Sequence, residues 1–291
     1  MCNFSYPITG LCRYFLWKPS TTIFAQVGFP MLNQETKTLP RCEACREGVE
    51  PPIAITMAFQ PIVDVKTRSI YAYEALVRGP QQESAGVILG QVNAQNRYAF
   101  DQSCRVKAIE LASSLGLADT NAKLSINFMP GAVYSPAACI QLTLRTAAKL
   151  NFPTDRLIFE ITEVEEVVDR KHLLGIVEEY RRQGFQIALD DLGSGYSGLN
   201  LLADLNPHLV KMDMDLTRKI DERPTAQVIV KKLVELCDGL GISLIAEGVE
   251  TLAEFECLQQ AGIRWMQGYL LARPAFESLG DFVLPSNPDA A

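Results

Sequence analysis

The sequence predicts an α/β protein, a barrel of the (β/α)8 class in which one strand runs antiparallel to the rest. From Ile53 onward, short apolar runs alternate with amphipathic helix-like stretches, a pattern typical of a mainly parallel sheet covered by helices. About eight such strand-like runs fall within about 240 residues, which is the size of a (β/α)8 barrel. Only the first two runs lack a helix between them, since residues 64–68 alone separate them. These two strands should therefore form an antiparallel hairpin.

Each predicted strand is a short apolar run bounded by polar, glycine or proline residues. In order, the strands are 56–63, 69–77, 123–128, 157–161, 185–189, 209–212, 243–246 and 265–268. Between them, apolar residues recur every three or four positions, which predicts helices. These helices are 101–115, 136–150, 165–183, 224–240 and 251–261. An open doubly wound sheet is the alternative, but no Gly-x-Gly-x-x-Gly sequence opens a helix as a dinucleotide fold requires.

The first 52 residues differ from the rest because they lack sustained periodicity and end in a charged, proline-bearing stretch. We interpret 1–52 as a short irregular extension or linker, 53–280 as the barrel and 281–291 as a C-terminal tail. Cys42 and Cys45 in the extension have the spacing of a metal or redox site. No second Cys-x-x-Cys pair or neighbouring histidine accompanies them, which favours a reduced tail over zinc binding or thiol sensing. Met31 is an alternative translation start.

Composition and charge exclude some classes of function. The chain has 291 residues, 48% of them hydrophobic, and a net charge of −7, so it offers no basic footprint for duplex nucleic acid. No apolar run reaches the length of a membrane span, and no cleavage-site pattern follows the mildly apolar stretch 4–17. We therefore expect a cytoplasmic protein with no duplex nucleic acid partner and no membrane span.

The most informative segment is 190–198, Asp-Asp-Leu-Gly-Ser-Gly-Tyr-Ser-Gly, which follows the apolar run 185–189. Two adjacent carboxylates at a strand end are costly unless a cation meets them, because paired anions resist ionising together. The three glycines allow a sharp turn and a close approach to a ligand. Taken alone, the segment fits a metal-binding strand end and a solvated acidic turn equally well.

Polar side chains also recur at or near the ends of the other predicted strands, and in a barrel these ends converge on one face. Buried charges must be paired or coordinate a metal. Carboxylate and amide oxygens without histidine or cysteine favour hard cations such as Mg²⁺ or Mn²⁺. An excess of carboxylates indicates two ions, an arrangement suited to in-line phosphoryl displacement. The polar strand-end residues are Glu74, Asn127, Glu160, Asp190, Asp191, Lys211, Asp213, Glu247, Glu250 and Gln267.

Lys211 lies among these carboxylates in the sequence pattern. It would either position or help to deprotonate a metal-bound water, or it would only balance the negative charge. The sequence leaves both roles open.

The tripeptide Glu74-Ala75-Leu76 lies within a longer motif, residues 73–79, and one motif before it and several after it occur in a fixed order along the chain. These are Phe59-Gln-Pro-Ile62, Ser125-Ile-Asn127 with Pro130, Glu160-Ile-Thr-Glu163, Asp190-Asp-Leu-Gly-Ser-Gly-Tyr196, Val210-Lys-Met-Asp213, Ala246-Glu-Gly-Val-Glu250, and Gln267-Gly-Tyr269 with Pro274. In these motifs, over about residues 53–280, the chain resembles the EAL-domain phosphodiesterases of bacterial signalling.

The resemblance implies a TIM-like barrel with one antiparallel strand, hydrolysis of cyclic di-GMP to linear pGpG with Mg²⁺ or Mn²⁺, and a homodimer. By motif, the implied metal ligands are Glu74, Asn127, Glu160, Asp190 and Asp191. The implied catalytic positions are Lys211 and Gln267 near the catalytic water, Glu247 supporting the metal centre, and Glu163, which holds the loop after Asp191. The implied nucleotide contacts are Gln60, Leu76, Arg78, Asp213, Glu250 and Pro274.

Two residues depart from the family pattern, Leu192 in place of the usual Phe and Ser194 in place of Thr. Both keep the character of the site and bear on loop packing, and so on regulation or rate. Some family members have lost catalytic residues and act as nucleotide receptors or protein-interaction modules. Because this chain keeps the motif residues, we expect an enzyme, with the receptor as the alternative. A sugar-processing barrel with a Glu pair would leave the adjacent aspartates and Lys211 unexplained.

Overall fold

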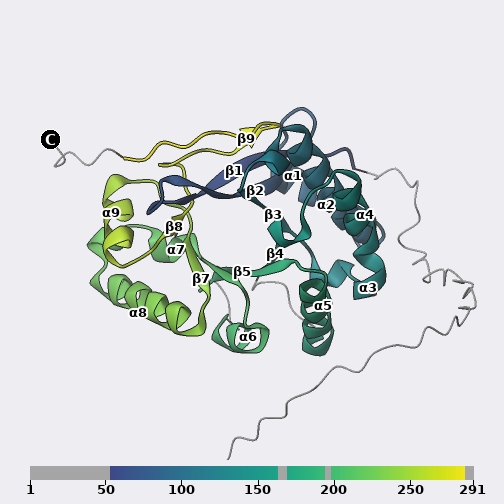
Figure 1. The fold of residues 1–291 in the computed structure, drawn as a ribbon. Coiled ribbons are helices and arrows are strands. Elements are labelled where there is room, and N and C mark those ends of the chain that lie inside the picture. Colours follow the sequence, from purple (N-terminus) through teal and green to yellow (C-terminus); the bar gives the residue numbers. More distant parts are fainter. Residues whose placement is uncertain (1–52, 163–168, 194–197, 286–291) are drawn as a thin grey trace, which may run out of the picture. The chain divides into compact units, whose positions relative to one another are not determined.

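The computed structural model describes residues 53–162, 169–193 and 198–285. Nine strands form one sheet in the order β2-β3-β4-β5-β6-β7-β8-β1-β9, and β1 also pairs with β2, so the first eight close into a barrel (Figure 1). The strands are β1 (Thr56–Asp64), β2 (Ser69–Arg78), β3 (Lys123–Asn127), β4 (Leu157–Thr162), β5 (Gln186–Leu192), β6 (Leu209–Met212), β7 (Ser243–Ala246), β8 (Trp265–Met266) and β9 (Ala275–Phe276). The predicted (β/α)8 barrel is confirmed.

Helices cover the outside of the barrel (Figure 1), and α2 also packs against the antiparallel β1. The helices are α1 (Ala85–Leu89), α2 (Arg97–Ser114), α3 (Pro136–Cys139), α4 (Gln141–Lys149), α5 (Arg170–Arg182), α6 (Gly198–Leu205), α7 (Met214–Thr217), α8 (Pro224–Leu240) and α9 (Leu252–Gln260). Short 3-10 helices span Leu117–Asp119, Pro130–Ala132, Thr154–Arg156 and Ile220–Glu222. Among the described residues, none of the helices combines the length and apolar character needed to cross a membrane.

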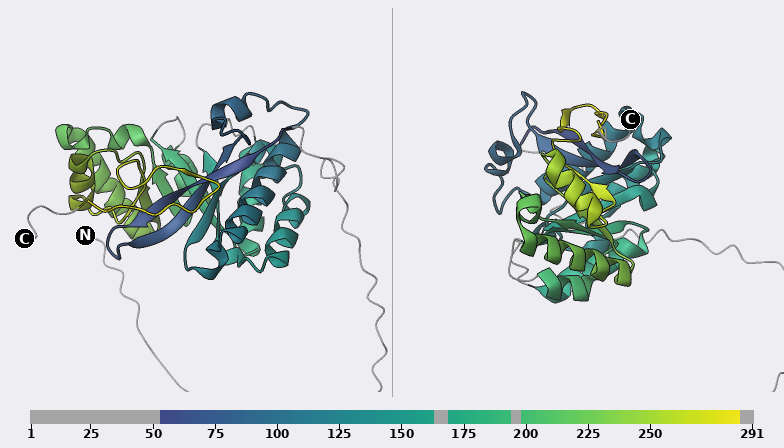
Figure 2. Two further views of the ribbon diagram at one scale, coloured as in Figure 1. Left: turned by 90° about the horizontal axis from the view of Figure 1, so that it is seen from above. Right: turned by 90° about the vertical axis from the view of Figure 1, so that its left-hand side faces the viewer.

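Strand β1 is the antiparallel strand of the ring, as predicted. It pairs with β2 from Thr56↔Arg78 to Asp64↔Ser69, and it is also antiparallel to β8. It therefore begins at the end of the barrel where the other strands finish. Figure 2 shows the C-terminal stretch, in yellow, lying along this hairpin, where β9 pairs with Ala58 and Phe59 of β1. The Tyr73 hydroxyl of β2 donates to the Gly280 carbonyl at 2.9 Å and so also binds the C-terminal stretch to the hairpin.

The barrel has two apolar cores because successive side chains of a strand point to opposite faces. The larger core lies between the strands and the helices, and includes Phe59, Phe159 and Tyr180. The smaller core fills the barrel interior with one layer of side chains. Its members are Ile62, Ala72, Ile158, Ala188, Leu209 and Ile245.

Several element boundaries differ from the prediction. The helix expected at 136–150 divides at the buried Ile140 into α3 and α4. Helix α5 begins at Arg170, where the Asp169 carboxylate accepts the amide of His172. Its expected start at residue 165 lies outside the described residues. Helices α1, α6 and α7 and strand β9 were not predicted, since segments of two to eight residues carry little periodicity. The extension 1–52, with Cys42 and Cys45, lies outside the described residues.

Candidate active site

The charged residues of the site form a layer directly above the interior apolar layer. Each lies two residues along its strand from a member of that layer, and residues two apart share a face of a strand. The pairs are Ala72 with Glu74, Ile158 with Glu160, Ala188 with Asp190, Leu209 with Lys211 and Ile245 with Glu247. On the antiparallel β1 the order reverses, so Gln60 precedes Ile62. The alternation of side chains along each strand therefore places six polar side chains at one end of the barrel interior. They are Gln60, Glu74, Glu160, Asp190, Lys211 and Glu247.

Lys211 lies at the centre of this layer and is 1% exposed. Its Nζ lies 2.7 Å from Glu247 Oε1, 2.9 Å from Glu160 Oε2, 3.2 Å from Glu74 Oε2 and 3.3 Å from Asp190 Oδ1. One buried ammonium cannot neutralise four carboxylates, and buried anions without compensation are costly. The donor set is therefore incomplete without further positive charge, which fits divalent cations bound by oxygen ligands.

Neutral side chains orient these carboxylates. Asn127 Nδ2 donates to Glu74 Oε1 at 2.9 Å, which leaves the amide oxygen of Asn127 available as a ligand. Gln267 Nε2 donates to Glu74 Oε2 at 2.8 Å and to Gln60 Oε1 at 3.2 Å. The hydroxyl of Ser125 donates to Glu160 Oε1. Ser125 was not predicted as a site residue, although its position two residues before Asn127 on β3 places both on the interior face.

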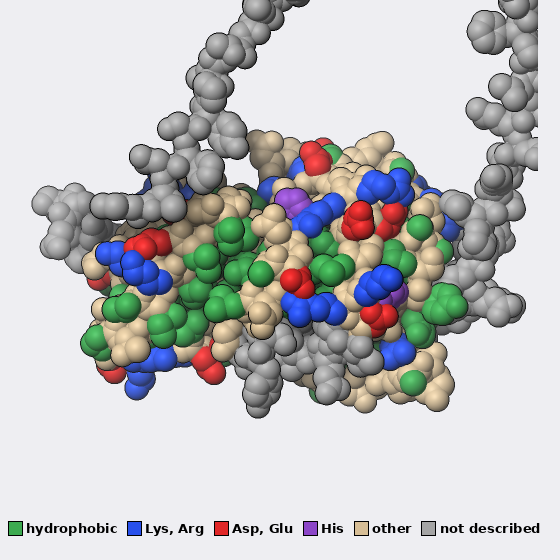
Figure 3. Space-filling model, turned by 90° about the horizontal axis from the view of Figure 1, so that it is seen from below, with side chains coloured by type: hydrophobic (Ala, Val, Ile, Leu, Met, Phe, Trp, Pro, Cys, Tyr) green, Lys and Arg blue, Asp and Glu red, His purple; other side chains and the backbone are tan. Residues whose placement is uncertain are grey.

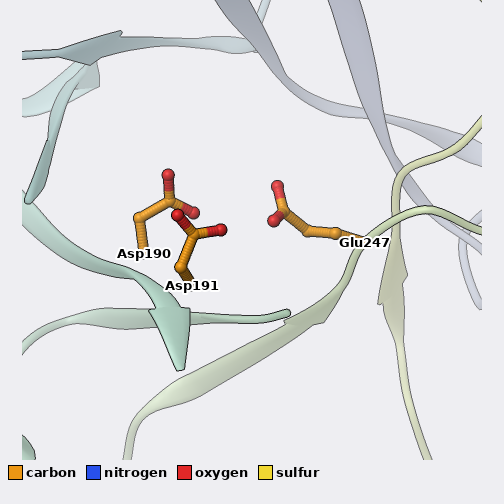
Figure 4. A group of neighbouring side chains, drawn as sticks. All are labelled: Asp190, Asp191 and Glu247. Atoms are coloured by element: carbon orange, nitrogen blue, oxygen red, sulfur yellow. The ribbon is translucent and has the colours of Figure 1, made fainter. Parts of the chain in front are cut away.

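The two adjacent aspartates reach the same site because the backbone of β5 is irregular. Adjacent strand residues ordinarily point to opposite faces. Asp191 has a φ of +56°, and the pairing of β5 with β6 shifts register between Leu189 and Leu192. Such a bulge re-aims a side chain, and aspartate tolerates this backbone better than most residues. Figure 4 shows the carboxylates of Asp190 and Asp191 directed toward that of Glu247. One oxygen of each of the three side chains lies within 4.8 Å of the others.

The electrostatics of the metal-free site favour protonation of several carboxylates. Burial, and then the neighbouring Asp190 and Asp213, raise the pKa of Asp191 to about 6. Burial also raises the pKa of Glu247 to about 8, although the charge of Lys211 opposes the shift. The pKa of Glu160 is raised well above its usual value by burial and by Glu74. Glu74 itself is buried, but Lys211 and the amides of Gln267 and Asn127 outweigh burial and lower its pKa.

A cavity of about 440 Å³ opens beside Glu74 and Asn127. It lies where β2 and β3 separate, beyond the pairing of Ala75 with Ile126. Its walls are mainly apolar and come from β1 and β2, from β3 and the residues just after it, and from α1 and α2. They include Leu76, Ala85, Leu89, Phe100, Phe128 and Met129. The sequence did not predict this cavity, because its walls come from segments distant along the chain.

Among the described residues, the predicted nucleotide contacts other than Gln60 have partners outside the Lys211 cluster, although the charge of Asp213 acts on Asp191. Arg78 Nη1 donates to the carbonyl of Val77 at 2.8 Å. Asp213 accepts the amide of Asp215 at 2.7 Å as the N-cap of α7. Glu250 pairs with Arg218 at 2.5 Å. Leu76 lines the cavity, and Pro274 directly precedes β9.

The structure brings together nine of the predicted site residues, and two further residues that the sequence singled out lie outside the described part of the chain. The residues brought together are Gln60, Glu74, Asn127, Glu160, Asp190, Asp191, Lys211, Glu247 and Gln267. Leu192, which departs from the family pattern, is buried in β5 at 4% exposure. Glu163 and Ser194 lie outside the described residues.

Comparison with solved structures finds the same fold in proteins that bind a cyclic dinucleotide. A standalone versatile EAL protein from Vibrio cholerae O395, solved in its c-di-GMP bound form, is 51% identical with a TM-score of 0.77, and the match covers 82% of this chain and 98% of that one. BlrP1 from Klebsiella pneumoniae, solved as a manganese/cy-diGMP complex at pH 9.0, is 34% identical with a TM-score of 0.74, over 79% of this chain and 58% of that one.

Comparison with curated proteins gives a consistent result. The cyclic di-GMP phosphodiesterase PA2567 of Pseudomonas aeruginosa is 29% identical over 234 residues, which cover 78% of this chain and 40% of PA2567. The antirepressor BluF of Escherichia coli is 27% identical over 238 residues, 82% of this chain and 59% of BluF. The chain spans between 31% and 59% of the length of the first curated relatives that it matches. The sequence model of the EAL domain matches residues 53–274, and the chain therefore belongs to the EAL domain family.

Proposed function

We propose that the chain is a metal-dependent phosphodiesterase that hydrolyses cyclic di-GMP to linear pGpG and so lowers the level of this second messenger. The observation that carries the proposal is the set of four carboxylates around Lys211, joined by Asp191 at the end of β5. Such an excess of buried oxygen ligands suits divalent cations that act on a phosphodiester. The named activity of the relative PA2567 agrees with it.

The residues present fit two Mg²⁺ or Mn²⁺ ions. Glu74, Asn127, Glu160, Asp190 and Asp191 would hold them, with Glu247 and Gln267 supporting the centre. When bound, the ions would supply a Lewis acid for the phosphate and a nucleophilic water at neutral pH. Lys211 contacts four of the carboxylates with three N–H donors, so its ammonium would hold the attacking water through a donor released when those carboxylates bind metal. Glu163 would hold the loop that follows Asp191.

The substrate would lie across the end of the barrel, in contact with Gln60, Leu76, Arg78, Asp213, Glu250 and Pro274. Arg78 would bind a phosphate, because a guanidinium pairs with two phosphate oxygens at once. The apolar cavity beside Glu74 has a volume of about 440 Å³, in the range of small-molecule sites, and would accept one base. Asp213 and Glu250 carry carboxylates that can accept N–H groups of guanine.

Product analysis with the purified chain tests this function. We expect cyclic di-GMP to be converted to pGpG with Mg²⁺ or Mn²⁺, and to persist when the metal is chelated. Glu74→Ala should abolish turnover, because it removes a ligand that also contacts Lys211, Asn127 and Gln267. Tight binding of cyclic di-GMP without turnover would contradict the enzyme and support the receptor alternative.

We further propose a cytoplasmic homodimer that forms through α8. Figure 3 shows hydrophobic side chains gathered over the part of the surface formed by α8 and α6. On α8 they include Val228, Ile229, Leu236 and Leu240, which are 62%, 43%, 39% and 48% exposed. Lys232 and Glu235 lie beside them, 2.7 Å apart. If two copies of α8 pack antiparallel about a two-fold axis, Lys232 of each copy faces Glu235 of the other.

A further inference from the structure

One buried carboxylate, that of Glu254, joins two loops at the substrate end of the barrel. The first loop, 213–219, follows β6, includes the short helix α7 and carries Asp213. The second, 247–251, follows β7 and carries Glu247 and Glu250. Glu254 Oε1 accepts the amide of Lys219 at 3.0 Å, and its Oε2 accepts the amides of Glu250 and Thr251 at 2.9 and 3.0 Å. Glu254 is 2% exposed.

A helix cap alone does not account for these contacts. Thr251 and Glu254 form a capping box at the start of α9, in which each side chain satisfies a backbone amide of the other residue. The bond to Lys219 is additional, because it reaches a different loop. Lys219 has a φ of +50°, an unfavourable backbone that surrounding contacts must maintain.

Two more contacts hold the same loops together. Met214 packs directly on Gly248, where an added Cβ would lie 2.6 Å from the Cβ of Met214. Arg218, from the first loop, pairs with the carboxylate of Glu250 in the second at 2.5 Å. Three contacts therefore connect the loops at three separate points.

The charge state of Glu254 suits this role. Burial alone would raise its pKa, but the three backbone amides and the charge of Arg218 outweigh burial and lower it. The ionised carboxylate accepts from both loops at once, since each of its oxygens is an acceptor.

We propose that Glu254, assisted by Arg218, is a positioning residue that sets Asp213 and Glu250 at the spacing that the bound nucleotide requires. The proposal rests on the function proposed above. Glu254 accepts the amides of Lys219, Glu250 and Thr251, and the nearby Asp213 and Glu250 are proposed to bind bases rather than the reacting phosphate. Glu247, at the start of the second loop, is held separately by its 2.7 Å contact with Lys211. The loss of Glu254 should therefore weaken substrate binding more than it slows the chemical step.

Glu254→Gln is the most informative variant. Glutamine keeps one oxygen acceptor and is accepted in a capping box, but its amide nitrogen cannot accept a hydrogen bond, so one of the two loops is released. Thr251→Ala is the matched control, because it weakens the cap of the same helix and leaves the Glu254 carboxylate in place. Arg218→Gln is a second test variant that leaves the buried core unchanged, since Arg218 is 32% exposed at its side chain.

The test is the steady-state kinetics of cyclic di-GMP hydrolysis by the full chain at saturating Mn²⁺. We expect Glu254→Gln to raise KM about ten-fold, the size of effect that losing one hydrogen bond to a charged acceptor produces, with kcat close to that of the wild type. A rise in KM at unchanged kcat means that binding was lost equally from the ground and transition states. Arg218→Gln should raise KM in the same direction, and Thr251→Ala should lower the melting temperature alone.

An unchanged KM in Glu254→Gln, or an equal rise in Thr251→Ala, would overturn the positioning role while the wild type remained active. A wild-type chain that hydrolyses no cyclic di-GMP would instead overturn the proposed function, and this inference with it.

Discussion

The side chains of the site are common residue types, and their unusual pKa values come from being buried in contact with one another. Lys211 is fully buried among carboxylates, and burial and its anionic neighbours act on its pKa in opposite directions, with the anions raising it well above the usual value. For Asp191 and Glu247, burial and neighbouring anions act in the same direction, since both raise the pKa of the carboxyl group and so favour its neutral form. The metal-free site therefore retains protons that a bound cation would displace.

A pH dependence of stability follows for the metal-free chain. The pKa values of Asp191 and Glu247 are raised to about 6 and about 8, so the folded chain binds more protons than the unfolded chain above about pH 4.5. The free energy of unfolding should then fall as pH rises from about 5 to 8. The lowered pKa of Glu74 and the raised pKa of Lys211 act below and above this window. Burial lowers the pKa of His208, which acts against the trend within the window, and the two carboxylates outweigh this one imidazole.

Thermal unfolding in a chelator across this pH range measures the effect. Asp191→Asn should flatten the acidic part of the profile, since asparagine also tolerates the positive φ at this position. Mn²⁺ should raise the melting temperature more at pH 8 than at pH 5, because its ligands must be deprotonated. A metal-free profile that is flat, or that rises with pH, would contradict the assignment.

At the scale of elements, the strands place the site residues and the loops join them. Glu160 on β4 and Lys211 on β6 lie in one layer of the barrel, because each is two residues beyond a member of the interior apolar layer. The irregular end of β5 adds Asp191. The close contact of Met214 with Gly248 then brings the loops after β6 and β7 together.

Two glycine-to-alanine substitutions test the close contact of Met214 with Gly248, because they separate the cost of a clash from the effect of adding a methyl group elsewhere. Gly248→Ala should destabilise the chain by about 1–3 kcal/mol, because the new Cβ would lie 2.6 Å from Met214 Cβ and the residue has a φ of +67°. Gly239→Ala is the control, since nothing lies within 4 Å of its Cβ in α8. That change should stabilise the helix by about 0.5–1 kcal/mol. Equal midpoints of denaturant unfolding for the two variants would contradict the close packing.

The sequence predicts the strands well because their apolar runs are continuous, and it predicts the members of the site because strand ends converge in a barrel. It does not predict how Asp190 and Asp191 reach one face, since this depends on a backbone irregularity at one residue. The hydroxyl contact of Ser125, the link through Arg218 and Glu254, and the cavity beside Glu74 were also missed. Each depends on contacts between segments far apart in the chain, which periodicity does not encode.

At the scale of the whole molecule, the end of the barrel that carries the site and the proposed dimer surface are separate features. The site lies at the carboxyl ends of the parallel strands. The α8 surface, with Val228, Ile229, Leu236 and Leu240, lies on the outer layer of helices. Since β6 leads into α7 and α8, the loop that carries Asp213 connects these two features along the chain.

Substitution on α8 tests the dimer. We expect Ile229→Lys with Leu236→Lys to convert a dimer to a monomer, because four added charges across a two-fold interface would be buried without partners. Light scattering coupled to size-exclusion chromatography measures the mass. Lys231→Glu serves as a control with a charge change at an exposed position on the same helix. A wild-type chain that remains monomeric at high concentration would contradict the proposal.

Titration of metal into the metal-stripped chain tests the central claim most directly, with pGpG formation from cyclic di-GMP as the readout. The initial rate should be zero in the presence of chelator, should rise with added Mn²⁺ or Mg²⁺, and should reach a plateau that Glu74→Ala never approaches. A chain that binds cyclic di-GMP but forms no pGpG at saturating concentrations of both metals would contradict the assignment of the Lys211 carboxylate cluster as a phosphodiesterase centre.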